Sequence, residues 1–138
     1  MFSSPNRAFG IVLGLIYLVG GILGFFITSA TPFTSTEGST VIGLFEVNPL
    51  HTLVHLVLGV ILLVCGLVGP RTSRVANLLV GGVFGILGIF GFIVLAAPSA
   101  NFLAINGADD VLHWATAVVL LALAIGADRA PVKIAAAA

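Results

Sequence analysis

The sequence predicts an all-α integral membrane protein, a four-helix bundle made of two transmembrane hairpins. The first observation behind this prediction is composition: 59% of the 138 residues are hydrophobic and only 7% are charged. A water-soluble domain carries about 25% charged residues, so this chain lacks the polar side chains needed to cover a water-facing surface. The second observation is the presence of four long apolar runs, and the third is the placement of the charged residues between them. We treat residues 1–138 as a single transmembrane domain.

The apolar runs approach the length of about 20 residues that a helix needs to cross a bilayer. The fourth run is the shortest and needs the polar turn before it to reach full span. Between the first two runs lies a segment rich in Ser, Thr, Gly and Pro, which we expect to form an outer loop over residues 28–48. The predicted helices cover residues 8–27, 50–68, 75–96 and 111–125.

Charge placement predicts the orientation of the helices. All basic residues fall on one side of the predicted membrane: Arg7, Arg71, Arg74, Arg129 and Lys133. Loops rich in Lys and Arg remain on the cytoplasmic side, so both termini are expected to be cytoplasmic. Four of the five acidic residues fall on the opposite side, and Asp128 is the exception.

The two halves of the chain resemble each other, which indicates an internal repeat. A shift of 58 residues pairs the polar residues that open the second and fourth helices: Asn48 with Asn106, His51 with Asp109, and His55 with His113. A shift of 67 residues pairs residues of the first and third helices: Gly14 with Gly81, Tyr17 with Phe84, Gly21 with Gly88, and Gly24 with Gly91. Two hairpins of the same orientation predict a pseudo-two-fold axis along the membrane normal.

Each copy of the polar motif begins with an asparagine suited to cap a helix. The side chains of Asn48 and Asn106 are expected to accept backbone N–H groups that the first helical turn leaves unpaired. Pro49 suits the first helical position, where its missing N–H is harmless. Asp109 follows Asn106 by three residues, as in a capping box. Much of the repeated pattern is therefore explained by helix-start chemistry.

The histidines are not explained in this way. His55 and His113 lie seven residues beyond their caps, about 10 Å along each helix at a rise of 1.5 Å per residue. An ionisable group at that depth in a membrane usually faces the bundle interior and indicates a functional site. His51 and Asp109 lie one turn earlier on the same helix faces as His55 and His113. The pseudo-two-fold axis would bring these four side chains together.

Three interpretations of this cluster remain open. Three imidazoles and a carboxylate match the ligands of a tetrahedral zinc site or of another divalent metal, with His51, His55, Asp109 and His113 as candidate ligands. Alternatively, His55 and His113 would be the axial pair of a haem held between helices. In the third interpretation the cluster binds nothing, and its hydrogen bonds set the register of the helices.

Motifs of common enzyme and nucleic-acid-binding classes are absent from the sequence. No Walker loop, GxSxG or HExxH motif is present, and the net charge of zero gives no basic surface for DNA or RNA. The single cysteine, Cys65, excludes an internal disulfide and a cysteine-rich metal site. Small-xxx-small pairs such as Gly10 with Gly14 predict close helix packing, either within the bundle or with a second copy or partner.

The stretches FEVNPLHTLVHLVLGV and NGADDVLHW, with the four-span layout, resemble an uncharacterised bacterial membrane family, domain of unknown function 4383. The resemblance covers most of the chain. It implies a small multi-span protein of the bacterial inner membrane and brings no established activity. It also draws attention to Asn48, His51, His55, Asp110 and His113, which lie in the shared stretches.

The sequence therefore favours a small, non-enzymatic membrane protein. We expect it to contact lipid and to act as an accessory subunit, either self-associating as a homo-oligomer or bound to a larger membrane complex, without nucleic acid. The alternative is a metal- or haem-binding redox protein that uses the histidine cluster. A transporter of a small solute has the weakest support, because no charged residue lies deep in a span. The expected location is the bacterial cytoplasmic membrane, with the polar cluster on the extracytoplasmic side.

Overall fold

The protein folds into four long helices and a short β-hairpin. The structure, a computed structural model, describes residues 4–128. In chain order the elements are α1 (Pro5–Ile27), β1 (Ser39–Val41), β2 (Phe45–Val47), α2 (Pro49–Val68), α3 (Pro70–Ala96), a 3₁₀ turn η1 (Pro98–Ala100) and α4 (Gly107–Gly126). All four helices are long and apolar enough to cross a membrane. The predicted all-α, multi-pass bundle is thus confirmed.

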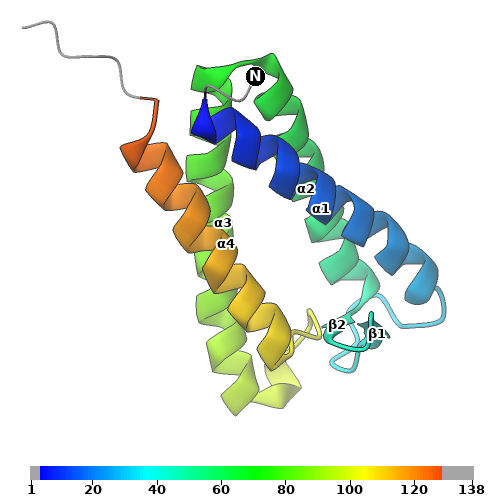
Figure 1. Ribbon diagram of the computed structural model, residues 1–138. Coiled ribbons are helices and arrows are strands. Elements are labelled where there is room, and N and C mark those ends of the chain that lie inside the picture. Colours follow the sequence, from blue (N-terminus) through cyan, green and yellow to red (C-terminus); the bar gives the residue numbers. More distant parts are fainter. Residues whose placement is uncertain (1–3, 129–138) are drawn as a thin grey trace, which may run out of the picture.

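The helices run alternately up and down and pack as two pairs (Figure 1). The most extensive contacts join α1 to α2 and α3 to α4, as expected for two hairpins. The pairs lie close together where the described chain begins and ends, which we call the terminus end (Figure 1). They diverge toward the opposite end, where the β-strands lie, which we call the hairpin end. Arg129 and Lys133, used above to predict orientation, lie outside the described residues.

Helix starts follow the local sequence signals. Proline occupies the first turn of α1, α2 and α3, and its fixed φ suits that position. α3 begins at Pro70, five residues before the predicted start, because the polar stretch with Arg71 and Arg74 forms its first turns. α4 likewise begins at Gly107 rather than at residue 111. Only Gly69, in an extended conformation, separates α2 from α3.

Glycines bring α1 and α2 into backbone contact. A Cβ on Gly14 would lie 2.5 Å from the backbone nitrogen of Leu63, and one on Gly59 would lie 2.5 Å from that of Leu18. A Cβ at either position would force the two helices apart. The lack of a side chain on these glycines therefore sets the distance between α1 and α2. The interpretation of Gly14 as a packing residue within the bundle fits its contact with Leu63.

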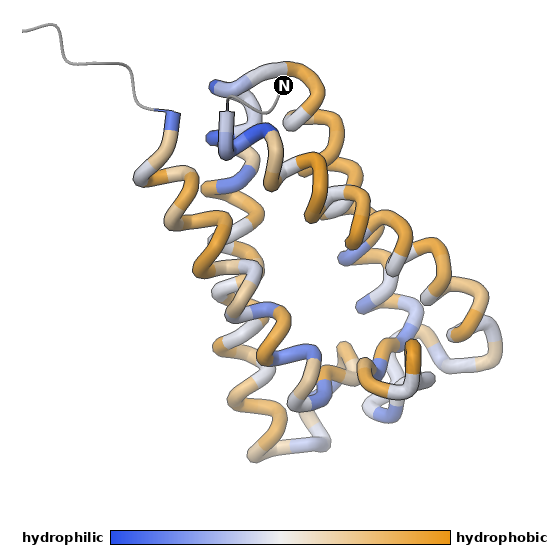
Figure 2. Tube along the Cα trace, viewed as in Figure 1, coloured by the Kyte–Doolittle hydropathy of each residue, from blue (hydrophilic) through white to orange (hydrophobic). Residues whose placement is uncertain are grey.

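An apolar layer separates two polar ends. The central core contains Tyr17, Leu58, Leu62, Val80, Phe84, Ala117 and Leu120. Figure 2 shows hydrophobic colouring along most of the helices, with hydrophilic residues gathered near the terminus end and toward the hairpin end. The Tyr17 hydroxyl and Thr116 Oγ1, 2.6 Å apart, form a hydrogen bond across this core between α1 and α4.

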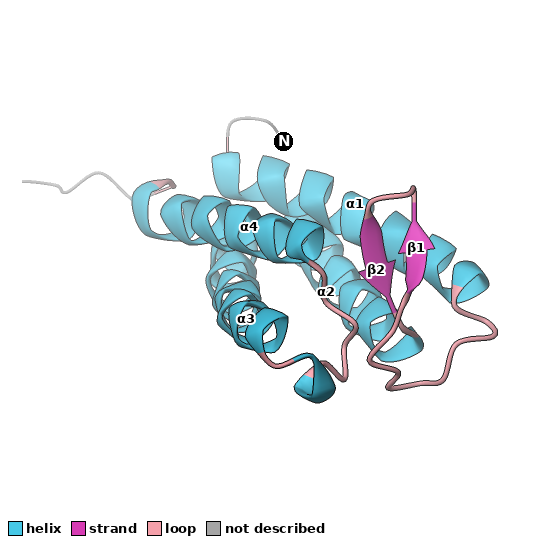
Figure 3. Cartoon of the chain, turned by 90° about the horizontal axis from the view of Figure 1, so that it is seen from below, coloured by secondary structure: helices cyan, strands magenta, loops and turns pink. Residues whose placement is uncertain are grey.

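The segment predicted as an outer loop contains the β-hairpin, which the sequence did not reveal. β1 and β2 pair antiparallel, with Thr40 opposite Glu46. Seen from the hairpin end, the strands lie between the ends of α1 and α4 (Figure 3). The backbone nitrogen of Glu46 donates to Asp109 Oδ2 of α4 over 3.2 Å, and Asn106 Nδ2 donates to the Leu44 carbonyl over 2.9 Å. These bonds fasten the hairpin to α4.

Candidate metal centre

Two capped helix starts position the polar residues of the hairpin end. Asn48 Oδ1 accepts the backbone N–H of His51 over 2.9 Å, and Asn106 Oδ1 accepts that of Asp109 over 3.0 Å. In return, Asp109 Oδ2 accepts the backbone N–H of Asn106 over 3.2 Å, which completes a capping box. Both asparagines thus occupy the N-cap positions predicted for them. Each cap fixes the first turn from which the histidines project.

Asn48 and Asn106 also organise the loops around the site. Asn48 Nδ2 donates to the carbonyls of Ser35 and Phe102 over 2.8 Å and 2.7 Å, so this one side chain joins the two connections at the hairpin end. Asn48 is fully buried. The helix start and both loops are therefore held as one unit.

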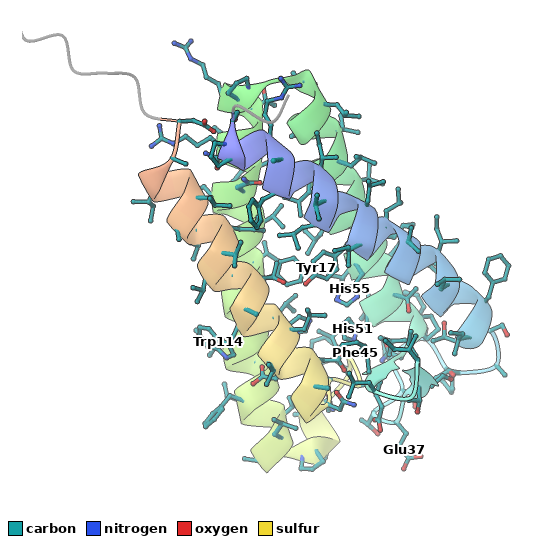
Figure 4. All side chains as sticks on the ribbon, viewed as in Figure 1. Tyr17, Glu37, Phe45, His51, His55 and Trp114 are labelled. Carbon is teal, nitrogen blue, oxygen red and sulfur yellow. The ribbon has the colours of Figure 1, made fainter. Side chains whose placement is uncertain are left out.

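Three histidines from α2 and α4 converge behind these caps. The ring centroids of His51 and His55 are 4.4 Å apart, and the His113 centroid lies 5.5 Å and 5.8 Å from them. Each histidine offers one nitrogen, and these three atoms all lie within 4.8 Å of one another. All three side chains are buried. Figure 4 shows His51 and His55 pointing into the space between α1 and α4.

Hydrogen bonding leaves much of this cluster unsatisfied. His51 Nε2 and His55 Nε2 are 3.1 Å apart and form one hydrogen bond. Within residues 4–128, both nitrogens of His113 are buried without a hydrogen-bond partner, whereas His51 also faces backbone groups of Glu46 and Leu103. A buried polar atom without a partner destabilises a fold by about 1–3 kcal/mol. The arrangement therefore suits a ligand that accepts nitrogen lone pairs better than a network of internal hydrogen bonds.

Aromatic rings form the inner wall of the cluster. The Tyr17 ring centroid lies 5.0 Å from that of His55, and the Phe84 centroid lies 5.6 Å from that of His113. Both aromatic residues are almost completely buried. They separate the histidines from the apolar core and keep water out on that side. In the sequence, the proposed repeat pairs Tyr17 with Phe84, and neither residue was connected with the site.

The predicted carboxylate ligand is engaged elsewhere. Asp109 Oδ2 accepts the two backbone N–H groups of Asn106 and Glu46, and the compact group of ligand atoms consists of histidines only. The neighbouring Asp110 carboxylate packs against Gly91, where a Cβ would clash with it. The structure thus brings together three of the four predicted metal ligands and places Asp109 at their edge.

Sequence reasoning missed a second polar cluster, at the terminus end. Asn6, Ser73 and Asn77 are fully buried there. The Asn6 carbonyl accepts from Ser73 Oγ over 2.7 Å and from Asn77 Nδ2 over 3.0 Å. Asn6 Nδ2 donates to Asp128 Oδ2 over 2.9 Å and to the Leu123 carbonyl over 3.1 Å. One asparagine therefore links α1 to α3 and α4. The available signal was Asn77, a polar residue inside the apolar run predicted over residues 75–96.

One protein-family model matches most of the chain. The family model described as Domain of unknown function (DUF4383) matches residues 7–126. The chain belongs to this family. The matched range includes all three histidines and both capping asparagines, so the candidate centre lies inside the DUF4383 domain. No curated protein and no solved structure matches the chain.

Proposed function

We propose that this DUF4383 protein binds one divalent transition-metal ion through His51, His55 and His113. A single observation carries the proposal: three buried imidazoles from two helices place their nitrogens within 4.8 Å of one another. Neutral imidazole is a favoured ligand of zinc, copper, nickel and iron. Three protein ligands with a fourth position left open are typical of zinc sites that act on a bound molecule.

The spacing of the nitrogens supports a small ion. Two nitrogens bound to one tetrahedral zinc lie about 3.4 Å apart, given bond lengths of about 2.1 Å. His51 Nε2 and His55 Nε2 are separated by 3.1 Å. A shift of a few tenths of an ångström would therefore allow both atoms to bind one ion. His113, whose nitrogens have no other partner among the described residues, would supply the third bond.

The same geometry favours a metal ion over haem. A haem between His55 and His113 needs an open plane between the two rings. His51 Nε2 lies 3.1 Å from His55 Nε2, and the His51 ring centroid lies 5.5 Å from that of His113. This third imidazole occupies space beside both rings that the macrocycle would need. We therefore infer an ion bound directly by the side chains.

The repeated contacts of the two hairpins support the proposed internal repeat. In each hairpin three glycines face residues of the partner helix. Adding 67 to the glycine's number and 58 to its partner's number converts each contact of the first hairpin into a contact of the second. The related contacts are Gly14–Leu63 and Gly81–Leu121, Gly21–Leu56 and Gly88–Trp114, and Gly24–Thr52 and Gly91–Asp110. A pseudo-two-fold arrangement accounts for the way in which α2 and α4 present His55 and His113 to one another. The ion would then lie near that axis.

The described charges support the proposed orientation in a bacterial inner membrane. Arg7, Arg71 and Arg74 lie at the terminus end, whereas Glu37 and Glu46 lie on the hairpin segment. Basic residues favour the cytoplasmic side. The histidine cluster would then lie in the extracytoplasmic half of the membrane and take its ion from that side.

A role as a self-associating or accessory subunit remains a second proposal with less support. Most helix glycines face neighbouring helices within the chain, as described for Gly14 and Gly59. A Cβ on Gly82 of α3, in contrast, would meet no atom within 4 Å, which leaves a small outer surface for a second copy. One assembly of defined size in mild detergent would support this role, and a strictly monomeric protein would contradict it.

Metal analysis of purified protein tests the main proposal. The chain would be produced in a bacterial membrane and purified without chelator. Elemental analysis is expected to find about one divalent transition-metal ion per chain. Replacement His55→Ala or His113→Ala should remove it, whereas Asn77→Ala, which changes a buried polar residue at the other end, should not. Metal-free wild-type protein that also binds no added Zn²⁺, or full occupancy in both histidine variants, would overturn the proposal.

A further inference from the structure

A pocket of about 470 Å³ opens between α1 and α4 beside the histidine cluster. Residues of the β-hairpin line it at the hairpin end, where Figure 3 shows the strands between the two helices. Figure 4 shows Tyr17, His55 and Phe45, which line the pocket, in the same space between α1 and α4. The pocket therefore lies within reach of one histidine of the cluster.

The walls of this pocket are almost entirely apolar. α1 contributes a row that includes Leu15, Ile16, Val19 and Leu23, and the hairpin contributes Val41, Ile42, Phe45 and Val47. The α1 residues Leu15, Ile16 and Val19 are about half exposed and belong to a membrane-spanning helix. In a bilayer these side chains face hydrocarbon, so the pocket is open to molecules dissolved in the membrane.

Three polar side chains line the pocket: Tyr17, His55 and Asp109. The Tyr17 hydroxyl is engaged with Thr116, and His55 Nε2 with His51. Asp109 is 1% exposed, and its Oδ1 is a buried acceptor without a hydrogen-bond partner in residues 4–128. Its Oδ2 is held by the capping box, which fixes the carboxylate in place. The pocket thus combines an apolar body with one strong, pre-positioned acceptor.

We propose that this pocket binds a membrane-soluble amphiphile with a hydroxyl head, such as an alkylphenol or alkylhydroquinone. The hydroxyl would donate a hydrogen bond to the Asp109 carboxylate, and the alkyl chain would lie along the Leu15–Leu23 row of α1. Asp109 lies in the first turn of α4, near the membrane boundary, whereas Leu15 lies near the middle of α1. A polar head near the boundary with an apolar tail toward the midplane is the ordinary orientation of an amphiphile.

The choice of a neutral head rests on the proposed metal ion. A carboxylate alone would also attract an ammonium group. A divalent ion held by His55 and its neighbours would repel such a cation across the low-dielectric pocket. The volume also exceeds what a water molecule or a simple ion fills, since one water occupies about 30 Å³ in the liquid.

Calorimetric titration of the whole chain in lipid nanodiscs tests this inference, with protein-free nanodiscs as the blank. The probes are 4-decylphenol, decylbenzene without the hydroxyl, and decylamine. We expect saturable binding of one 4-decylphenol per chain and about tenfold weaker binding of decylbenzene, because the hydrogen bond to Asp109 is lost. Decylamine should bind more weakly than the phenol to metal-loaded protein.

Two glycine variants identify the site. Gly20 lines the pocket, and a Cβ there would meet no atom within 4 Å, so Gly20→Leu should fill the pocket without disturbing the bundle. Gly126→Leu is the control, because a Cβ on Gly126 is equally unobstructed and Gly126 does not line the pocket. We expect at least tenfold weaker phenol binding in Gly20→Leu and wild-type binding in Gly126→Leu.

The outcomes separate this inference from the proposed function. Equal binding of 4-decylphenol and decylbenzene would show that the pocket accepts any alkyl chain and would overturn the inference. Unchanged phenol binding in Gly20→Leu, or no saturable phenol binding to wild type, would also overturn it. Metal content is measured on the same samples. Phenol binding to wild-type protein that contains no metal and also binds no added Zn²⁺ would reject the metal proposal alone, and metal-loaded protein without phenol binding would reject this inference alone.

Discussion

The two buried polar clusters of the bundle differ in how completely their hydrogen bonds are satisfied. At the terminus end, Asn6 donates to α4 and accepts from α3, and of the described groups there only Asn77 Oδ1 is buried without a partner. At the hairpin end, both nitrogens of His113 have no partner within the described chain. Both clusters lie inside a membrane-spanning bundle, where few other partners are available.

This difference in hydrogen bonding is our reason for proposing a structural role for the terminus-end cluster and a binding role for the histidine cluster. Interhelical hydrogen bonds in membranes contribute about 0.6 kcal/mol each, so a satisfied cluster such as that of Asn6 is explained by helix association. Unsatisfied buried groups destabilise the fold and require another explanation, such as a bound ion. The three imidazoles supply the nitrogen ligands that a transition metal prefers. The terminus end therefore holds the helices together, whereas at the hairpin end we propose a bound metal ion.

The largest expected effect comes from replacing His113 by leucine. Loss of one metal ligand should weaken metal affinity by more than about 100-fold, since even outer-shell changes weaken it by 10–100-fold. In metal-free protein the same change should raise the free energy of unfolding by about 1 kcal/mol, because it removes unpartnered polar atoms. Metal competition assays and denaturant unfolding in detergent measure the two quantities. A large loss of stability in the metal-free variant would contradict our description of the cluster.

Replacing Asn77 by leucine should have the opposite effects, with lower stability and unchanged metal affinity. Its Nδ2 donates to both the carbonyl and Oδ1 of Asn6, at 3.0 Å each. We expect the free energy of unfolding to fall by about 1–2 kcal/mol, while metal affinity remains that of the wild type. The measurements are the same unfolding and competition assays. A change in metal affinity would show that the two ends are coupled and not independent.

The four spans and the helix caps followed directly from the sequence. Apolar length predicts a span without knowledge of tertiary contacts, and Asn48 and Asn106 act on N–H groups only a few residues away. The convergence of His55 and His113 was expected from the proposed repeat, because equal distances from two caps place them at equal depth. These features depend on local chemistry and spacing.

Other features depend on contacts between distant residues and were not predictable. Asn6 and Asn77 bond across 71 positions of sequence, and neither belongs to a repeated motif. The β-hairpin consists of two three-residue strands, too short for a clear alternating pattern. The capping bond of Asp109 was predicted, but its second bond, from Glu46, depends on where the hairpin packs. That packing, and the pocket beside it, required the three-dimensional structure.

The smallest expected effect is a pH dependence at the terminus end. Partial burial raises the pKa of Asp128, but hydrogen bonds from Ser4 and Asn6 and the charge of Arg74 outweigh it, so the pKa is lowered overall. A carboxyl whose pKa is lower in the folded state stabilises the fold above its unfolded value of about 3.9, and this stabilisation is lost as the pH falls through the folded pKa.

Asp128→Asn should therefore flatten the dependence of stability on pH below about pH 4. Unfolding in detergent across that range, with Glu37→Gln as a control on the exposed hairpin segment, measures the effect. An identical pH dependence in wild type and Asp128→Asn would contradict the role assigned to this carboxylate.

Thermal unfolding with and without Zn²⁺ tests the central claim most directly. A ligand that binds only the folded state raises the Tm, and the protein would be compared with its His113→Leu and Asn77→Leu variants under both conditions. We predict that Zn²⁺ raises the Tm of wild type and of Asn77→Leu by similar amounts and leaves that of His113→Leu unchanged. An equal rise in His113→Leu, or no rise in wild type, would contradict the assignment of the hairpin-end histidines as a metal site.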